Sequence, residues 1–83
     1  MDINVLRDAL RAQPFLPFRL HLTDGRAFRV QHPELLALGV TGRTVVYVNP
    51  DENDRVVIAN TLLVVTLEFE FAAPAGGGNG VSG

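Results

Sequence analysis

The sequence predicts a mainly β protein in which one N-terminal helix precedes a small five-stranded antiparallel barrel. Three observations lead to this fold class: an alternating hairpin pattern at residues 18–30, β-branched runs after it, and a helical stripe of apolar residues before it. A closed or nearly closed barrel suits such short strands because closure leaves few exposed edges. We therefore expect one domain over residues 1–71, followed by a flexible glycine-rich tail over residues 72–83.

The helix is predicted close to the start of the chain. Asp2 is a suitable N-cap, and Ile3, Leu6 and Leu10 follow at helical spacing until Pro14 ends the pattern. A helix of about ten residues is marginal by itself. We therefore expect its apolar stripe to cover one opening of the β-structure.

The first hairpin, residues 18–30, carries the clearest pattern in the chain. Apolar and polar residues alternate along both arms, as expected for strands with one buried face. A two-residue turn would place Leu20 opposite Arg29 and set an apolar side chain against a charge. A three-residue turn, with Gly25 in the left-handed conformation as a bulge, instead pairs Leu20 with Phe28. We predict the three-residue turn because it brings the apolar faces of both strands together.

Proline and polar residues divide the rest of the chain into strands. Pro33 lacks the amide that a ladder needs, so we expect a short turn at residues 32–34 before a strand resumes. Two β-branched runs joined by an acidic loop then predict a second hairpin, with strands at residues 43–49 and 55–59. A break at residues 60–61 precedes the last predicted strand, residues 62–71.

The order of these elements resembles the Sm-like fold, a small SH3-like barrel. Residues 20–26, L-H-L-T-D-G-R, are similar to the first half of that family's signature, and residues 56–63, V-V-I-A-N-T-L-L, lie where its second half is expected. The resemblance covers residues 2–71 and implies ring assembly through the last two strands. The Asp and Asn that line the family's RNA pocket have no evident counterpart near residues 37–42, and Asn60 stands where an Arg-Gly pair is expected.

The chain also resembles a group of small uncharacterised bacterial proteins. Those proteins carry the string D-G-R-x-F-x-V-x-H-P-E, which residues 24–34 match. This second resemblance implies no particular activity.

Composition limits the classes of function. A domain of about 70 residues buries only about 60% of its unfolded surface, so association with another copy is a natural source of stability. The chain has no cysteine, which excludes disulfides and thiolate metal sites, and its net charge of −2 argues against strong sequence-independent binding of nucleic acid. Charge is unevenly distributed along the chain. Up to Arg43 there are six arginines and four carboxylates, and after Arg43 there are one arginine and five carboxylates.

No segment of the sequence predicts attachment to a membrane. No apolar run approaches the roughly 18 residues of a membrane span, and no signal-peptide pattern is evident. We therefore expect a cytoplasmic protein without a membrane partner.

Residues suited to catalysis or metal binding are sparse. His21 is expected to point outward from a strand, and His32 and Glu34 flank a proline in a bend. The histidines lack helical ligand spacing and an evident third ligand, and the acidic loop at residues 51–54 is too short for an EF-hand. We therefore expect no enzymatic activity, no metal site and no cofactor.

One candidate site is the outward face of the first hairpin. Its polar members could bind RNA or another anion, and they are Arg19, His21, Arg26 and Arg29. The predicted register places Arg19 opposite Arg29, and like charges in that position cost stability unless a negative group lies nearby. That group is either an external phosphate or the carboxylates of Glu68 and Glu70 on the last strand, which pairs with the first in such a barrel. We favour the internal carboxylates because they are already present in the chain.

A second candidate site is an apolar face of the second hairpin. If one set of its residues faces the core, the alternate set must face outward and would contact another chain, the N-terminal helix or a peptide. The set expected to face the core is Thr44, Val46, Val48, Val56 and Ile58. The set expected to form a partner or oligomer surface is Val45, Tyr47, Val57 and Ala59. The sequence therefore predicts a non-enzymatic protein that self-associates or binds another protein, with RNA or anion binding as the alternative.

Overall fold

The computed structural model describes residues 1–70 of the chain, which form one α-helix, six strands and three short 3-10 helices. The helix and strands are α1 (Ile3–Arg11), β1 (Phe18–Leu22), β2 (Ala27–Val30), β3 (Leu36–Leu38), β4 (Thr44–Asn49), β5 (Arg55–Asn60) and β6 (Val64–Phe69). The 3-10 helices are η1 (Pro33–Leu35), η2 (Pro50–Glu52) and η3 (Thr61–Leu63). The predicted domain end at residue 71 and the predicted tail, residues 72–83, lie outside the described residues.

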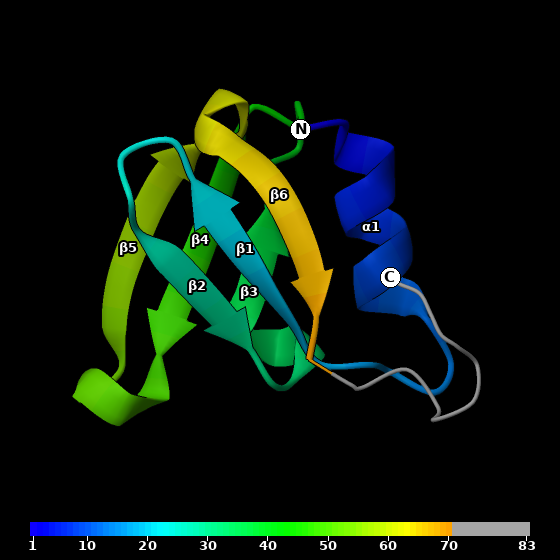
Figure 1. Ribbon diagram of the computed structural model, residues 1–83, viewed down its shortest axis with the longest axis horizontal. Coiled ribbons are helices and arrows are strands. Elements are labelled where there is room, and N and C mark those ends of the chain that lie inside the picture. Colours follow the sequence, from blue (N-terminus) through cyan, green and yellow to red (C-terminus); the bar gives the residue numbers. More distant parts are fainter. Residues whose placement is uncertain (71–83) are drawn as a thin grey trace, which may run out of the picture.

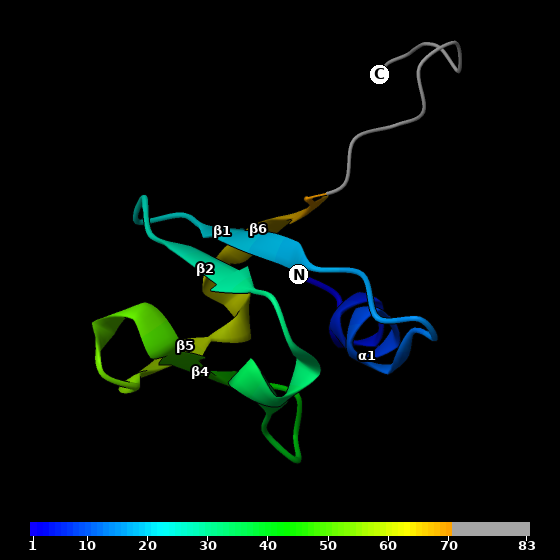
Figure 2. The ribbon, with the colours of Figure 1, turned by 90° about the horizontal axis from the view of Figure 1, so that it is seen from below.

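The strands form two three-stranded antiparallel sheets, with strand orders β2-β1-β6 and β3-β4-β5. The sheets lie one over the other, and α1 lies at one side of this pair, next to β6 (Figures 1 and 2). The mainly β class with an N-terminal helix is confirmed. A closed five-stranded barrel is not found: residues 1–70 contain six strands in two separate sheets. The turn η1, where Pro33 has no amide to donate, separates β2 from β3, and these two strands belong to different sheets.

The first hairpin has the predicted register. Leu20 pairs with Phe28, and Arg19 pairs with Arg29. Gly25 has a φ of 90°, in the left-handed region that favours glycine. The three-residue turn is therefore confirmed, and it places the two arginines side by side on the outer face of the sheet.

The helix begins and packs largely as predicted. The carboxylate of Asp2 accepts a hydrogen bond from the amide of Asn4 at 2.9 Å, which satisfies one of the unpaired donors at the start of α1. Leu6 is fully buried and Ala9 nearly so, while Leu10 is partly buried against the same core. α1 lies beside β6 (Figure 1), and its buried residues pack against the core that the two sheets share.

The two faces of the second hairpin are exchanged relative to the prediction. The set expected to form a partner surface lies in the core: Val45, Tyr47 and Ala59 are buried, and Val57 is partly buried against them. Of the set expected inside, Ile58 is 67% exposed and Val56 is 58% exposed. Alternation could not decide between the faces because both carry β-branched residues. The correction moves the exposed apolar surface to the opposite side of the same sheet.

The last strand begins two residues later than predicted and contains an irregularity. Thr61 to Leu63 form η3, and the pairing between β1 and β6 shifts register between His21 and Leu22. After this shift Val64 is fully buried, whereas the next residue, Val65, is 55% exposed. The shift lets Leu67 continue the core face of β6, where it is partly buried.

Candidate functional site

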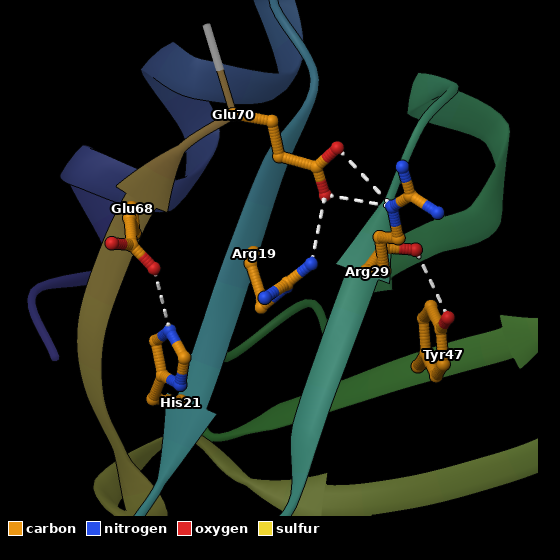
Figure 3. Close-up of polar contacts among 6 residues, drawn as sticks. All are labelled: Arg19, His21, Arg29, Tyr47, Glu68 and Glu70. Atoms are coloured by element: carbon orange, nitrogen blue, oxygen red, sulfur yellow. Dashed lines mark hydrogen bonds and ion pairs between the residues drawn. The ribbon is translucent and has the colours of Figure 1, made fainter. Parts of the chain in front are cut away.

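The paired arginines of the first hairpin share one carboxylate. The Nε atom of Arg29 donates to both carboxylate oxygens of Glu70, at 3.1 and 2.9 Å. The guanidinium of Arg19 lies 3.8 Å from the same carboxylate, so Glu70 sits between the two arginines (Figure 3). Of the two carboxylates expected to balance the like-charged pair, Glu70 does so, whereas Glu68 contacts His21 instead.

The other two residues of the predicted anion face also have acidic neighbours. Nε2 of His21 lies 3.0 Å from a carboxylate oxygen of Glu68 on β6 (Figure 3). Arg26, beside the hairpin turn, donates from Nε to Asp24 at 2.7 Å. Arg19, His21 and Arg29 thus lie together on the outer face of the first sheet, whereas Arg26 forms a separate pair at the end of the hairpin.

These contacts shift two pKa values. Hydrogen bonding to Glu70 raises the pKa of Arg29. The backbone amide of Arg26 donates to Asp24 and lowers the pKa of that carboxyl. Because the folded-state pKa of Asp24 lies below its unfolded value, its contribution to stability is present above the unfolded pKa. That contribution is lost as the pH falls through the folded pKa.

Replacing Glu70 with Gln is expected to lower the thermal midpoint at low ionic strength, because Arg19 and Arg29 would then face each other without a carboxylate. The decrease should be small, since all three side chains are in contact with solvent. It should disappear in about 1 M salt, where the Debye length is about 3 Å. Thermal melts followed by circular dichroism at both salt concentrations measure the effect. A decrease that is the same at both concentrations would show that Glu70 acts through its hydrogen bonds to Arg29 and not through its net charge.

The exposed apolar surface lies on the outer side of the second sheet. Val46 pairs with Ile58 and Val48 pairs with Val56, so these four aliphatic side chains form two adjacent rows. Ala37 of β3 continues the row of Val46 and is exposed. We call these five residues the aliphatic face. It contains no ionisable group.

The aliphatic face borders a sheet edge. Among residues 1–70, β5 pairs with β4 alone, so its other side is an edge of the sheet. Between Arg55 and Asn60 the exposed side chains of β5 are Val56 and Ile58. Sheet edges are commonly protected by charges, prolines or bulges that discourage pairing with another strand. The central four residues of β5 contain none of these protections.

The side of the same hairpin that was expected to form a partner surface packs into the core and is not exposed. The ring of Tyr47 stacks on that of Phe28, with centroids 4.6 Å apart and an interplanar angle of 10°. Its hydroxyl donates to the carbonyl oxygen of Arg29 at 2.9 Å and so connects the two sheets (Figure 3). Burial raises the pKa of Tyr47.

One signal in the sequence pointed to the aliphatic face. Thr44 and Asn60 pair with each other across β4 and β5, and they share the side of the sheet that carries Val46 and Ile58. Their polar side chains mark that side as the one in contact with water. The β-branched residues between them obscured this signal.

Residues considered for catalysis or metal binding are dispersed over the surface. His32 precedes η1 and Glu34 lies within it, and both are exposed. Asp51 and Glu52 lie in η2. The side-chain oxygen of Asn49 accepts a hydrogen bond from the backbone amide of Asp51, and its side-chain nitrogen donates one to the carboxylate of Glu52. Within residues 1–70, no group of three or more His, Cys, Asp or Glu side chains is placed to hold a metal ion.

Fold and surfaces together define a small β protein of two stacked antiparallel sheets, closed at one side by a helix and bearing an uncharged sheet face beside an edge strand. Comparisons with protein-family models, curated proteins and solved structures found no match to the chain. In the part of the chain that the structure describes, no helix has the length and apolar character needed to cross a membrane.

Proposed function

We propose that this protein acts by associating with a second copy of itself through the aliphatic face and the adjoining edge of β5. The observation that supports the proposal is that β5 carries exposed aliphatic side chains and is also an edge strand. Val56 and Ile58 are exposed on β5, and the side of β5 away from β4 is a sheet edge in the described residues. A contiguous apolar patch beside an edge strand is typical of a protein interaction site.

The residue order along β5 favours a two-fold contact between identical strands. Arg55 begins the strand and Asn60 ends it, with four uncharged apolar residues between them. Antiparallel pairing of two β5 strands would place Arg55 of one copy near Asn60 of the other, whereas parallel pairing would bring the two arginines together. Antiparallel pairing would also continue the aliphatic face across six strands. The same patch would then serve both copies, as a two-fold interface requires.

The small size of the domain supports the same conclusion. A core built from about 70 residues leaves a large fraction of apolar surface in contact with water. Pairing two sheet edges removes two unprotected strands and brings the exposed aliphatic side chains of the two β5 strands next to each other. The resemblance to the Sm-like fold implies a different geometry, in which β5 of one copy pairs with β6 of the next. That pairing would build a ring, whereas pairing of two β5 strands would build a dimer, so a measurement of oligomer size would distinguish the two.

Replacing Ile58 with Asp is expected to dissociate the assembly, because antiparallel pairing of two β5 strands would bring the new carboxylates of both copies close together on one face and replace aliphatic contacts between the strands. The variant should remain folded, since this side chain is 67% exposed within one copy. Light scattering over a concentration series should show a dimer or larger species for the unaltered protein and a monomer for the variant. The matched control is Val5→Asp, which introduces the same charge at an exposed aliphatic position on α1. A monomeric unaltered protein at high concentration, or an Ile58→Asp variant of unchanged size, would contradict the proposal.

The proposal assigns no catalysis to the protein. Among residues 1–70 the one contact between a histidine and a carboxylate joins His21 to Glu68, and both side chains are in contact with solvent. Solvent exposure leaves such a pair without the desolvation that tunes catalytic acids and bases.

RNA or anion binding through the first hairpin ranks second. Glu70, Glu68 and Asp24 already balance the charges of that face. An external anion would have to compete with these carboxylates for the arginines. A titration with short RNA at low and moderate salt tests the alternative, since binding through arginines weakens steeply with salt.

A further inference from the structure

A basic hollow lies between the second half of α1 and the end of β3. It has a volume of about 320 Å³ and is lined by Arg7, Leu10, Arg11, Leu38, Gly39 and Val40. Val40 is fully exposed. The lining therefore combines two arginines with apolar residues, and a negatively charged partner would complement it.

The two arginines have no acidic partner within the described part of the chain. Arg7 donates to the side-chain oxygen of Asn4 at 2.9 Å, and neither Arg7 nor Arg11 forms an ion pair in residues 1–70. The two residues are four apart on one helix, where like charges destabilise the helix. The helix dipole stabilises the positive charge of Arg11, which lies in the last turn, but it does not stabilise that of Arg7, which lies in the middle of α1. An anionic partner would relieve the repulsion between them.

The complementary charge lies in the loop between β4 and β5. Asp51, Glu52 and Asp54 are exposed there, and Glu52 pairs with Arg55 at 3.4 Å. Neither Asp51 nor Asp54 has an ion-pair partner in residues 1–70. This acidic loop and α1 lie at opposite ends of the molecule (Figures 1 and 2). The loop of one copy therefore cannot reach its own hollow, and a contact between the two has to join different copies.

We propose that the acidic loop of one copy docks into the basic hollow of a second copy. The contact is head-to-tail, so it leaves one loop and one hollow free and adds further copies, which form a ring where the rotation closes and a filament where it does not. It rests on the proposed function in taking a second copy as the partner, and it uses surfaces separate from the aliphatic face. Opposite charges at the two ends steer successive copies into this orientation.

A charge-swap experiment on the full chain tests the contact. One variant, Arg7→Glu/Arg11→Glu, makes both the hollow and the loop acidic. The other, Asp51→Arg/Asp54→Asn, makes both basic, and asparagine at residue 54 tolerates the left-handed φ of 57° found there. Each variant alone is expected to lose at least about tenfold in head-to-tail affinity, from lost ion pairs and new repulsion together. An equimolar mixture is expected to restore association, because every loop then meets a hollow of opposite charge.

Sedimentation velocity with one variant fluorescently labelled measures this preference at low ionic strength. Matched controls reverse a charge at exposed positions outside both surfaces, Arg43→Glu and Glu34→Arg, and should change nothing. Circular dichroism confirms that each variant is folded. Equal association of like and unlike variants, or no gain on mixing, would overturn the proposal.

The experiment also separates this contact from the one through β5. Contact through the aliphatic face involves no altered charge, so it would pair like and unlike variants equally. Repeating the mixture in the Ile58→Asp background removes the β5 contact. A preference for unlike variants in that background supports the head-to-tail contact even if the proposed β5 contact is wrong. A loss of the preference in both backgrounds contradicts the head-to-tail contact alone.

Discussion

Replacing Tyr47 with Asp is expected to unfold the protein and not simply to change its oligomeric state. Tyr47 is 4% exposed, stacks on Phe28 and connects the two sheets through its hydroxyl. Removal of a buried aromatic ring costs about 3–5 kcal/mol, and a buried carboxylate without a partner adds to this. A protein with about 70 ordered residues has a free energy of unfolding of roughly 4–10 kcal/mol. The substitution therefore removes most or all of the stability.

Urea titration followed by circular dichroism measures this effect. The matched control is Tyr47→Phe, which keeps the ring and loses the hydrogen bond to the carbonyl of Arg29. It should remain folded and lose about 0.5–1.5 kcal/mol. A folded Tyr47→Asp protein that only dissociates would place Tyr47 on a surface, contrary to its burial. The contrast with Ile58→Asp is direct, because the two residues lie on opposite sides of the same sheet.

Replacing Leu6 with Ala is expected to produce the second largest loss of stability. Leu6 is fully buried between α1 and the sheets, and a substitution of this kind costs about 2–5 kcal/mol. The nine-residue helix is too short to be stable by itself, so its folding depends on this contact. Denaturant unfolding should show a lower midpoint with an unchanged slope if α1 and the sheets unfold together.

The control for this prediction is Val5→Ala on the same helix. Val5 is 48% exposed, and alanine is the better helix former, so the change should be within about 0.5 kcal/mol. If Leu6→Ala had as little effect as Val5→Ala, α1 would not be part of the cooperative core. A separate early transition for α1 would point to the same conclusion.

The first hairpin shows which features a short sequence can specify. Its two arms alternate between apolar and charged residues, so a shift by one residue would set Leu20 against Arg29. The register, the bulge at Gly25 and the adjacent arginines were all predictable from that constraint, and the structure has them. Pro33 was equally informative because a missing amide must interrupt a ladder wherever it falls.

The second hairpin lacks such a constraint. Val45 and Val46 are adjacent and equally apolar, so either could face the core, and the choice of face was wrong when made from the sequence. The side that packs is decided by Tyr47, whose ring stacks on Phe28 and whose hydroxyl bonds to β2. These contacts join residues from different sheets, which alternation within one strand cannot reveal.

The sequence by itself determined most of the elements, the register of the first hairpin and the pair Arg19–Arg29, because each depends on neighbouring residues and local backbone limits. Only the tertiary structure decided that Glu70 lies between those arginines, that the aliphatic face is outside, and that Arg7 and Arg11 share a hollow with the end of β3. The physical reason is that these arrangements depend on how two sheets and a helix stack. Stacking is selected by side-chain volume and by hydrogen bonds between residues that are distant in the chain.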